Sequence, residues 1–183
     1  MIKKSYVLLL SVFVSACSTT GNAVLQRADG FSGRPDWAKE KNPYFYFEKN
    51  KIAHFVGSAN IDGKSGSPLA CLKTSVKTKE NISSRIRERL ASAAQAIQND
   101  ISVSPGNFIA IAGIIAVKLK RDDCYWEKVR AQKNAVRYNV FVKFSIPIEE
   151  LKQTIANSAE RNGSGREFSE PVNRHITEIL QTQ

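Results

Sequence analysis

The chain has few of the residues on which catalysis and metal binding depend. It contains two histidines, His54 and His175, and three cysteines in 183 residues. Neither residue type occurs at the spacing of a tetrahedral zinc site. The stretch Gly57-Ser58-Ala59 lacks the second glycine of a G-x-S-x-G nucleophile turn, and no loop has the G-x-x-x-x-G-K-[ST] spacing of a phosphate cradle. The sequence therefore predicts no catalytic residue, no metal and no cofactor, and we expect a protein that is not an enzyme.

Long apolar runs are scarce as well. The run over residues 6–14 is shorter than the roughly 20 residues that a membrane-spanning helix needs. It follows Lys3 and Lys4, and the small residues Ser15 and Ala16 stand between it and Cys17. A short basic region, an apolar core and small residues before the cleavage point are typical of a signal peptide. We predict that residues 1–16 are removed on export.

The cleavage region has a second implication. Residues 14–17, Val-Ser-Ala-Cys, resemble the bacterial lipobox. This resemblance implies that the Cys17 thiol receives a diacylglycerol and that Cys17 becomes the acylated first residue of the mature protein. Several acyl chains give stable anchoring where a single chain would be reversible. In Gram-negative lipoproteins an Asp after the cysteine favours the inner membrane, and Ser18 stands there instead. We therefore expect an outer-membrane lipoprotein that faces the periplasm, with display at the cell surface as the alternative.

The charge is strongly positive. The full chain has 27 basic and 17 acidic residues, a net charge of +10. The signal peptide carries Lys3 and Lys4 and no acidic residue, so its removal lowers the net charge from +10 to +8. For an exported protein this favours lipopolysaccharide, anionic lipid or cell-wall polymer over nucleic acid as the partner. Solubility alone would account for the charge equally well.

Two cysteines remain once Cys17 carries lipid. An oxidising compartment would allow Cys71 and Cys124 to form a disulfide. Helix phase argues mildly against the bond, because Cys71 follows Leu69, a residue of the expected apolar stripe, by two positions, or about 200°. Two buried free thiols remain the alternative, since the sequence does not show whether the two Cα atoms come within about 7 Å.

The organisation of the chain suggests one domain with a tether. Residues 17–33 are polar and weakly patterned, which predicts a lipidated flexible tether. Residues 34–161 are long enough for a single α+β domain. Residues 44–47 and 52–59 predict one β-hairpin, and residues 124–130 and 136–146 a second. Residues 162–183 predict a linker and a C-terminal helix.

Residues 68–99 give the clearest helix. Its apolar residues recur at three- and four-residue steps and predict one stripe facing the sheet: Leu69, Leu72, Val76, Ile82, Ile86, Leu90, Ala93 or Ala94, and Ile97. Basic residues lie largely off this stripe. A solvated helix face is the simplest explanation for them. The alternative is a set of contacts to an anionic partner, and its candidates are Lys73, Lys77, Arg85, Arg87 and Arg89.

Two further segments complete the expected fold. Residues 108–119 are apolar and partly β-branched, which favours a buried strand over a short helix. Pro147 and the acidic pair Glu149 and Glu150 predict a helix that runs to about residue 161. The resulting fold is α+β: an antiparallel sheet of two hairpins covered on one face by a long amphipathic helix and a shorter C-terminal helix.

Several of these segments, in this order, resemble the Lpp-twenty (twenty-kilodalton lipoprotein) domain family. The segments are residues 35–38, 55–59, 125–126, 138–142 and 146–151, with the long helix between the second and third. Members are bacterial envelope lipoproteins, and a FlgP-like branch builds a disk or ring around the flagellar motor. The resemblance implies a scaffold or binding role. Residues 101–119 and the tail after 161 depart from the family pattern.

Three hypotheses follow from the sequence. The first is a non-catalytic structural lipoprotein of an envelope assembly, with copies of itself or other envelope proteins as partners. The second is a monomeric module that binds an anionic polymer such as peptidoglycan or lipopolysaccharide. The third, a hydrolase, has the least support, and we expect no small-molecule substrate.

Overall fold

The computed structural model describes residues 23–39, 44–49, 51–97, 105–131, 134–161, 165–174 and 176. Within these residues, antiparallel strands form one sheet of five in the order β1-β4-β5-β3-β2. The strands are β1 (Ala23–Arg27), β2 (Tyr44–Glu48), β3 (Ile52–Asp62), β4 (Lys120–Arg130) and β5 (Val136–Pro147). The helices are α1 (Ser67–Ile97), α2 (Pro105–Lys118), α3 (Ile148–Arg161) and α4 (Gly165–Arg174). The α+β class is confirmed.

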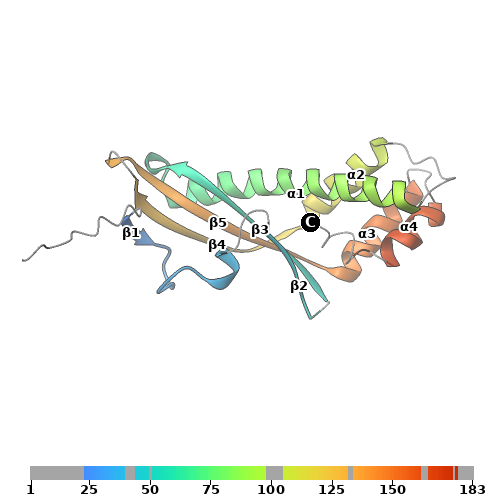
Figure 1. Cartoon of the computed structure of the whole chain (residues 1–183), viewed down its shortest axis with the longest axis horizontal. Coiled ribbons are helices and arrows are strands. Elements are labelled where there is room, and N and C mark those ends of the chain that lie inside the picture. Colours follow the sequence, from blue (N-terminus) through green and yellow to red (C-terminus); the bar gives the residue numbers. More distant parts are fainter. Residues whose placement is uncertain are drawn as a thin grey trace, which may run out of the picture.

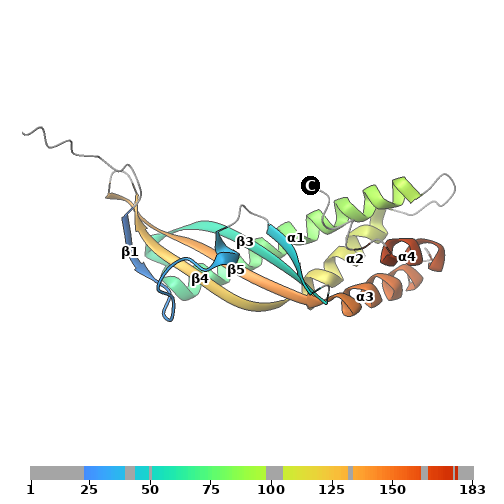
Figure 2. The same cartoon turned by 60° about the horizontal axis from the view of Figure 1, so that its bottom comes forward.

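The arrangement is elongated. Figure 1 shows a twisted sheet with α1 along one face, while α2, α3 and α4 gather at one end of the molecule around the second half of α1. Figure 2, turned by 60°, shows the same separation between a sheet end and a helical end. The long helix α1 joins the two because its first half packs against β3, β4 and β5 and it also packs against α2 and α4.

Both predicted hairpins are present. Strand β2 pairs with β3, and β4 pairs with β5. The two hairpins join through β3 and β5, which pair over their whole length from Ile52↔Pro147 to Asp62↔Arg137. Strand β5 alternates strictly between buried and half-buried side chains. This period of two places one row of residues in the main core beneath α1: Tyr138, Val140, Val142, Phe144 and Ile146.

The buried side of α1 follows a four-residue step. Its fully or nearly buried positions are Ala70, Thr74, Thr78, Ile82, Ile86, Leu90 and Ala94. A helix has 3.6 residues per turn, so each four-residue step moves the buried position by about 40° around the axis. The buried line thus winds around the helix as α1 passes from the sheet to the other helices.

The predicted apolar stripe of α1 is therefore only half correct. Ile82, Ile86, Leu90 and Ala94 are buried as expected. In the first turns the prediction is wrong, because Leu69, Leu72 and Val76 are 44%, 56% and 53% exposed. Small side chains face the sheet instead. The hydroxyl of the buried Thr74 donates a 2.8 Å hydrogen bond to the Ala70 carbonyl, which satisfies it within the helix.

Residues 105–118 form helix α2, so the favoured strand over residues 108–119 is wrong. The buried residues Phe108, Ile111, Ala112 and Ile115 recur at three- and four-residue steps along it. Contacts with α1 and α3 stabilise this helix. The segment is apolar on nearly every side, and such a run does not distinguish a buried strand from a helix by periodicity.

Two predicted boundaries also need correction. Residues 17–33 were expected to be tether, but Ala23–Arg27 form strand β1, which pairs with β4. Alternation is hard to see in five residues whose side chains are all exposed. At the other end, α4 begins at Gly165. Val172 and Ile176 are buried in the main core, so α4 and Ile176 belong to the domain.

Gly57 of β3 sets how closely α1 approaches the sheet. A β-carbon at this position would lie 2.7 Å from Thr78 Cβ. Gly57→Ala should therefore lower the free energy of unfolding by about 1–3 kcal/mol, because an added methyl group forces α1 away from β3. Urea denaturation measures the change. Gly113→Ala is the control: its β-carbon meets nothing within 4 Å, and alanine should stabilise α2 by about 0.5–1 kcal/mol. Equal effects of both substitutions would contradict this account of Gly57.

Candidate functional site

Cys71 and Cys124 form a disulfide bond. Their Cα atoms are 6.1 Å apart, and the bond joins the first turns of α1 to β4. The helix-phase argument against this bond fails because the sheet-facing position is Ala70 rather than Leu69. Cys71 is the next residue along and is half-buried at the edge of the main core. The bond fixes the long helix to the sheet. It joins two cysteines that are 53 positions apart in the sequence.

The basic residues predicted to contact an anionic partner do not form one patch. Lys73, Lys77, Arg85 and Arg87 are exposed, and Arg89 is half-buried. Lys73 and Arg87 lie about four full helical turns apart, so they share a side of α1 with Lys77. Arg85 and Arg89 lie on a different side, since the step from Lys73 to Arg85 leaves a rotation of about 120° around the axis. The structure therefore divides the five candidates into two groups.

A shallow open groove lies between α1 and α2. Its volume is about 380 Å³, and it is lined by Lys79, Glu80, Ser83, Ser84, Arg87, Ile109 and Ala116. The Arg87 guanidinium donates to Ser84 Oγ at 3.4 Å, and that hydroxyl in turn donates to Glu88 at 3.1 Å. The lining of the groove thus combines basic, acidic, hydroxyl and apolar groups. This mixture resembles an interaction surface more than a pocket for one small ligand.

Large apolar side chains are exposed on two helical surfaces. On α2, the exposed fractions of Ile109, Ile114 and Val117 are 56%, 36% and 80%. We call these three residues the α2 surface. The second group consists of Leu69, Leu72 and Val76 in the first turns of α1. Neither surface was predicted from the sequence, because residues 108–119 were expected in a buried strand and the α1 group in the core.

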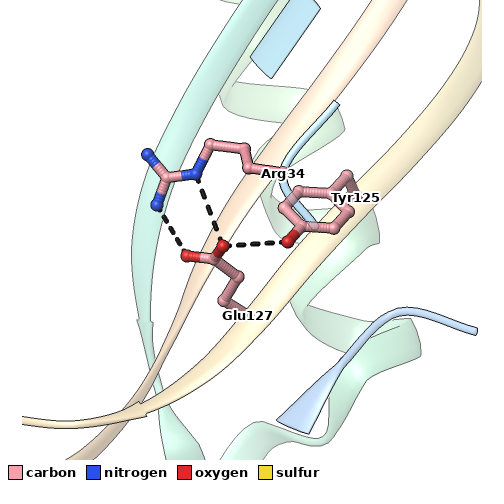
Figure 3. Close-up of polar contacts among 3 residues, drawn as sticks. All are labelled: Arg34, Tyr125 and Glu127. Carbon is pink, nitrogen blue, oxygen red and sulfur yellow. Dashed lines mark hydrogen bonds and ion pairs between the residues drawn. The ribbon is translucent and has the colours of Figure 1, made fainter. Parts of the chain in front are cut away.

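An ion pair with a buried carboxylate lies on the sheet face opposite α1. Figure 3 shows Arg34 and Tyr125 converging on the carboxylate of Glu127. Arg34 Nη2 donates to Glu127 Oε2 at 2.6 Å, and the Tyr125 hydroxyl donates to Oε1 at 2.8 Å. The Glu127 side chain is only 5% exposed. Residues 28–38 lie over this face of the sheet. Their buried residues Ala28 and Ala38 form a second small core with Tyr125, and the half-buried Trp37 and Phe141 pack against it.

This cluster shifts the pKa of two of its members. Burial, together with the hydrogen bond to Glu127, raises the pKa of Tyr125 to about 12. Burial alone would raise the pKa of Glu127, but hydrogen bonds from Arg34 and Tyr125 and the Arg34 charge hold that pKa below its usual value. The carboxylate is therefore charged and the phenol neutral at physiological pH. The cluster fixes the N-terminal segment to β4, and perturbed pKa values also arise in such structural ion pairs.

His54 lies in a second polar cluster. Its ring is nearly buried and stacks on Tyr46, with the ring centroids 4.7 Å apart. Nε2 lies 3.0 Å from a Glu48 carboxylate oxygen, and Nδ1 lies 3.4 Å from Asp122 Oδ2. Ser145 Oγ donates to Asp122 Oδ1 at 2.6 Å rather than to the imidazole. This is not the order of contacts of a Ser-His-Asp triad, in which the hydroxyl bonds to the imidazole.

Some features named from the sequence lie outside the described residues. These include the signal peptide, Cys17 and His175. Among the described residues, no group of three His, Cys, Asp or Glu side chains could hold a metal ion. In the same part of the chain, no helix combines the length and the apolar character needed to cross a bilayer.

The disulfide predicts a large effect of reduction. The double variant Cys71→Ala/Cys124→Ala should lose about 4 kcal/mol of unfolding free energy, because the cross-link restricts the unfolded chain. Urea denaturation with and without reductant measures this. Reductant should bring the wild type to the stability of the variant and leave the variant unchanged. Free-thiol adducts on both cysteines, after alkylation of unreduced protein, would contradict the bond.

The Tyr125 cluster predicts a loss of stability in alkali. Between the unfolded pKa of 10.0 and the folded value of about 12, the unfolded chain loses the Tyr125 proton while the folded chain keeps it. Stability must therefore fall as pH rises through this window. Urea denaturation at several pH values should show a steeper fall for the wild type than for Tyr125→Phe, in which the other titrating groups are the same. Identical slopes, with tyrosinate absorbance appearing near pH 10 for all tyrosines, would contradict the shift.

Comparison with known proteins adds no relative: no family model, no curated protein and no solved structure matches this chain.

Proposed function

We propose that this protein is a lipid-anchored component of the outer-membrane envelope with a structural, non-catalytic role in a larger assembly. The lipobox-like segment ending at Cys17 supports the anchor. The disulfide between Cys71 and Cys124 is consistent with an oxidising compartment outside the cytoplasm. The resemblance to the Lpp-twenty family supports a scaffold role, and a flagellar disk or ring is one such assembly.

The observation that carries this proposal is the α2 surface. Ile109, Ile114 and Val117 are exposed on a helix that is otherwise packed against α1 and α3. Contiguous exposed apolar patches commonly mark interaction sites. Helix α2 also lies in the helical part of an elongated domain, away from β1 (Figures 1 and 2). A second copy or another envelope protein would bury it.

The alternative role, binding of an anionic polymer, draws support from the exposed basic residues of α1. Their division between two sides of the helix favours this role less than a single patch would. Salt distinguishes the two roles, because exposed charge contacts are screened at high ionic strength whereas apolar contacts persist. Retention on cell wall that salt releases would favour the polymer.

The proposal predicts that charge on the α2 surface disrupts an assembly. Envelope extracts in mild detergent should contain the wild-type chain in particles much larger than its 20.3 kDa mass. The variant Ile109→Asp/Val117→Asp should run as a monomer, because an interface would have to bury two carboxylates. Light scattering after size exclusion gives the masses, and circular dichroism checks that α2 still forms.

The matched control is Gln153→Asp/Asn157→Asp. Both residues are exposed on α3, four positions apart, so this variant adds the same charge elsewhere. It should keep the wild-type particle size. A wild-type chain that is monomeric in the extract, or a control that dissociates equally, would overturn the assembly role.

A further inference from the structure

The exposed apolar residues of α1 lie on a face of the helix that is covered further along. Leu72 and Leu90 lie about five full helical turns apart, as do Val76 and Ala94, so each pair shares one side of the helix. The exposed fraction falls from 56% at Leu72 to 0% at Leu90. Helix α2, which packs on α1, ends at Lys118, where the chain enters β4. The first turns of this face are left uncovered within the described chain.

A fourth exposed apolar side chain, from β1, belongs to the same end of the domain. Leu25 is 44% exposed and lines a shallow depression with Gly63 and Lys64, which directly precede α1. Figure 1 shows β1 and the start of α1 at the same end of the molecule. We define the apolar end as Leu25, Leu69, Leu72 and Val76.

Basic side chains surround the apolar end. Lys73 and Lys77 are exposed beside Leu72 and Val76 on α1. Lys64 and Arg130 are exposed at the sheet end, where Arg130 pairs with Ala23. The exposed carboxylate Asp62 accepts a hydrogen bond from the Lys64 backbone. Apolar side chains bordered by lysines are typical of helices that lie at the surface of an anionic bilayer.

The position of the lipid anchor brings this end to the membrane. Six residue steps separate Cys17 from Ala23, the first residue of β1. A fully extended chain of this length spans about 20 Å. Acyl chains on Cys17 would therefore hold the β1 end of the domain within about 20 Å of the bilayer. The residues closest to the membrane would be those of the apolar end.

We propose that the apolar end is a second membrane-contact site, at which Leu25, Leu69, Leu72 and Val76 enter the headgroup region of an anionic phospholipid leaflet. Lys73 and Lys77 bind the negative headgroups. Helix α2 covers the same face of α1 beyond the first turns, so contact is confined to the end of the domain. The inference rests on the proposed anchor at Cys17, which raises the local concentration of lipid. The second contact fixes the orientation of the domain relative to the bilayer, which a lipid tether alone would leave free.

A fluorescent label on α1 tests this proposal. In the full-length lipidated protein Cys17 is acylated and Cys71 is bonded to Cys124, so Val76→Cys supplies one free thiol for a nitrobenzoxadiazole label. Protein reconstituted into vesicles of phosphatidylcholine and phosphatidylglycerol is mixed with nitroxide-bearing lipid, which quenches labels at the membrane. Quenching should be several-fold stronger at position 76 than at the control, Gln153→Cys on the exposed side of α3.

The lysines give the test a second arm. A lysine near an anionic surface contributes roughly a fivefold factor to the docked population. Adding Lys73→Gln/Lys77→Gln should therefore lower the ratio of docked to undocked protein on the order of twentyfold. Replacing phosphatidylglycerol by neutral lipid, or raising the salt concentration, should have a similar effect. Arg161→Gln/Arg174→Gln, which removes the same charge from exposed positions of α3 and α4, is the matched control and should leave docking unchanged.

The outcomes separate the two proposals. If the protein does not remain on the vesicles at all, the anchor, and with it the proposed function, is overturned. If it stays anchored while positions 76 and 153 are quenched equally, only the membrane-contact site is overturned. Quenching that follows protein density rather than lipid charge would show contact between copies at this face, and would also overturn the site.

Discussion

The structure depends on how closely α1 approaches the sheet. Gly57 leaves room for Thr78 against β3, and small residues line the first half of the helix on that side. The disulfide between Cys71 and Cys124 holds the same region on β4. With its first turns fixed in this way, a helix of 31 residues, about 46 Å long, extends past the sheet. Its second half provides the surface on which α2 and α4 pack.

This close approach also explains where the sequence predicted the fold and where it did not. The hairpins were recognisable because β5 alternates cleanly, and α1 because its apolar residues recur at helical steps. The side of α1 that faces the sheet was not recognisable, because Ala70 and Thr74 are buried where larger residues would not fit. Hydrophobicity alone places Leu69 and Leu72 in the core. The error in the helix phase then led to the mistaken argument against the disulfide.

Long-range contacts account for the other differences. Strand β1 forms because β4 has a free edge with which it pairs. The five residues of β1 are all exposed, so they show no hydrophobic pattern from which this pairing could be predicted. The Arg34–Glu127 pair joins residues 93 positions apart, so no local pattern points to it. Of the candidate site, the sequence identified Cys71 and Cys124 as a possible pair, and the structure shows the bond. The role of the exposed lysines of α1 stays a prediction. The two apolar surfaces depend on tertiary packing and could only be found in the structure.

The ion pair between Arg34 and Glu127 also bears on the proposed membrane contact, because it lies next to β1. Glu127 is charged and nearly excluded from solvent, so removal of Arg34 would take the ion-pair partner from a buried carboxylate and leave it the hydrogen bond from Tyr125, which is unfavourable. The pair therefore holds residues 28–38 against the sheet, beside β1. A lipid anchor restrains orientation only if a surface that the bilayer can contact lies close to it. In the proposed anchored protein Cys17 lies six residue steps before β1, and the residues of α1 at that end are apolar and bordered by lysines. In the proposed orientation the helical end would project away from the bilayer, and the α2 surface would be accessible to a partner.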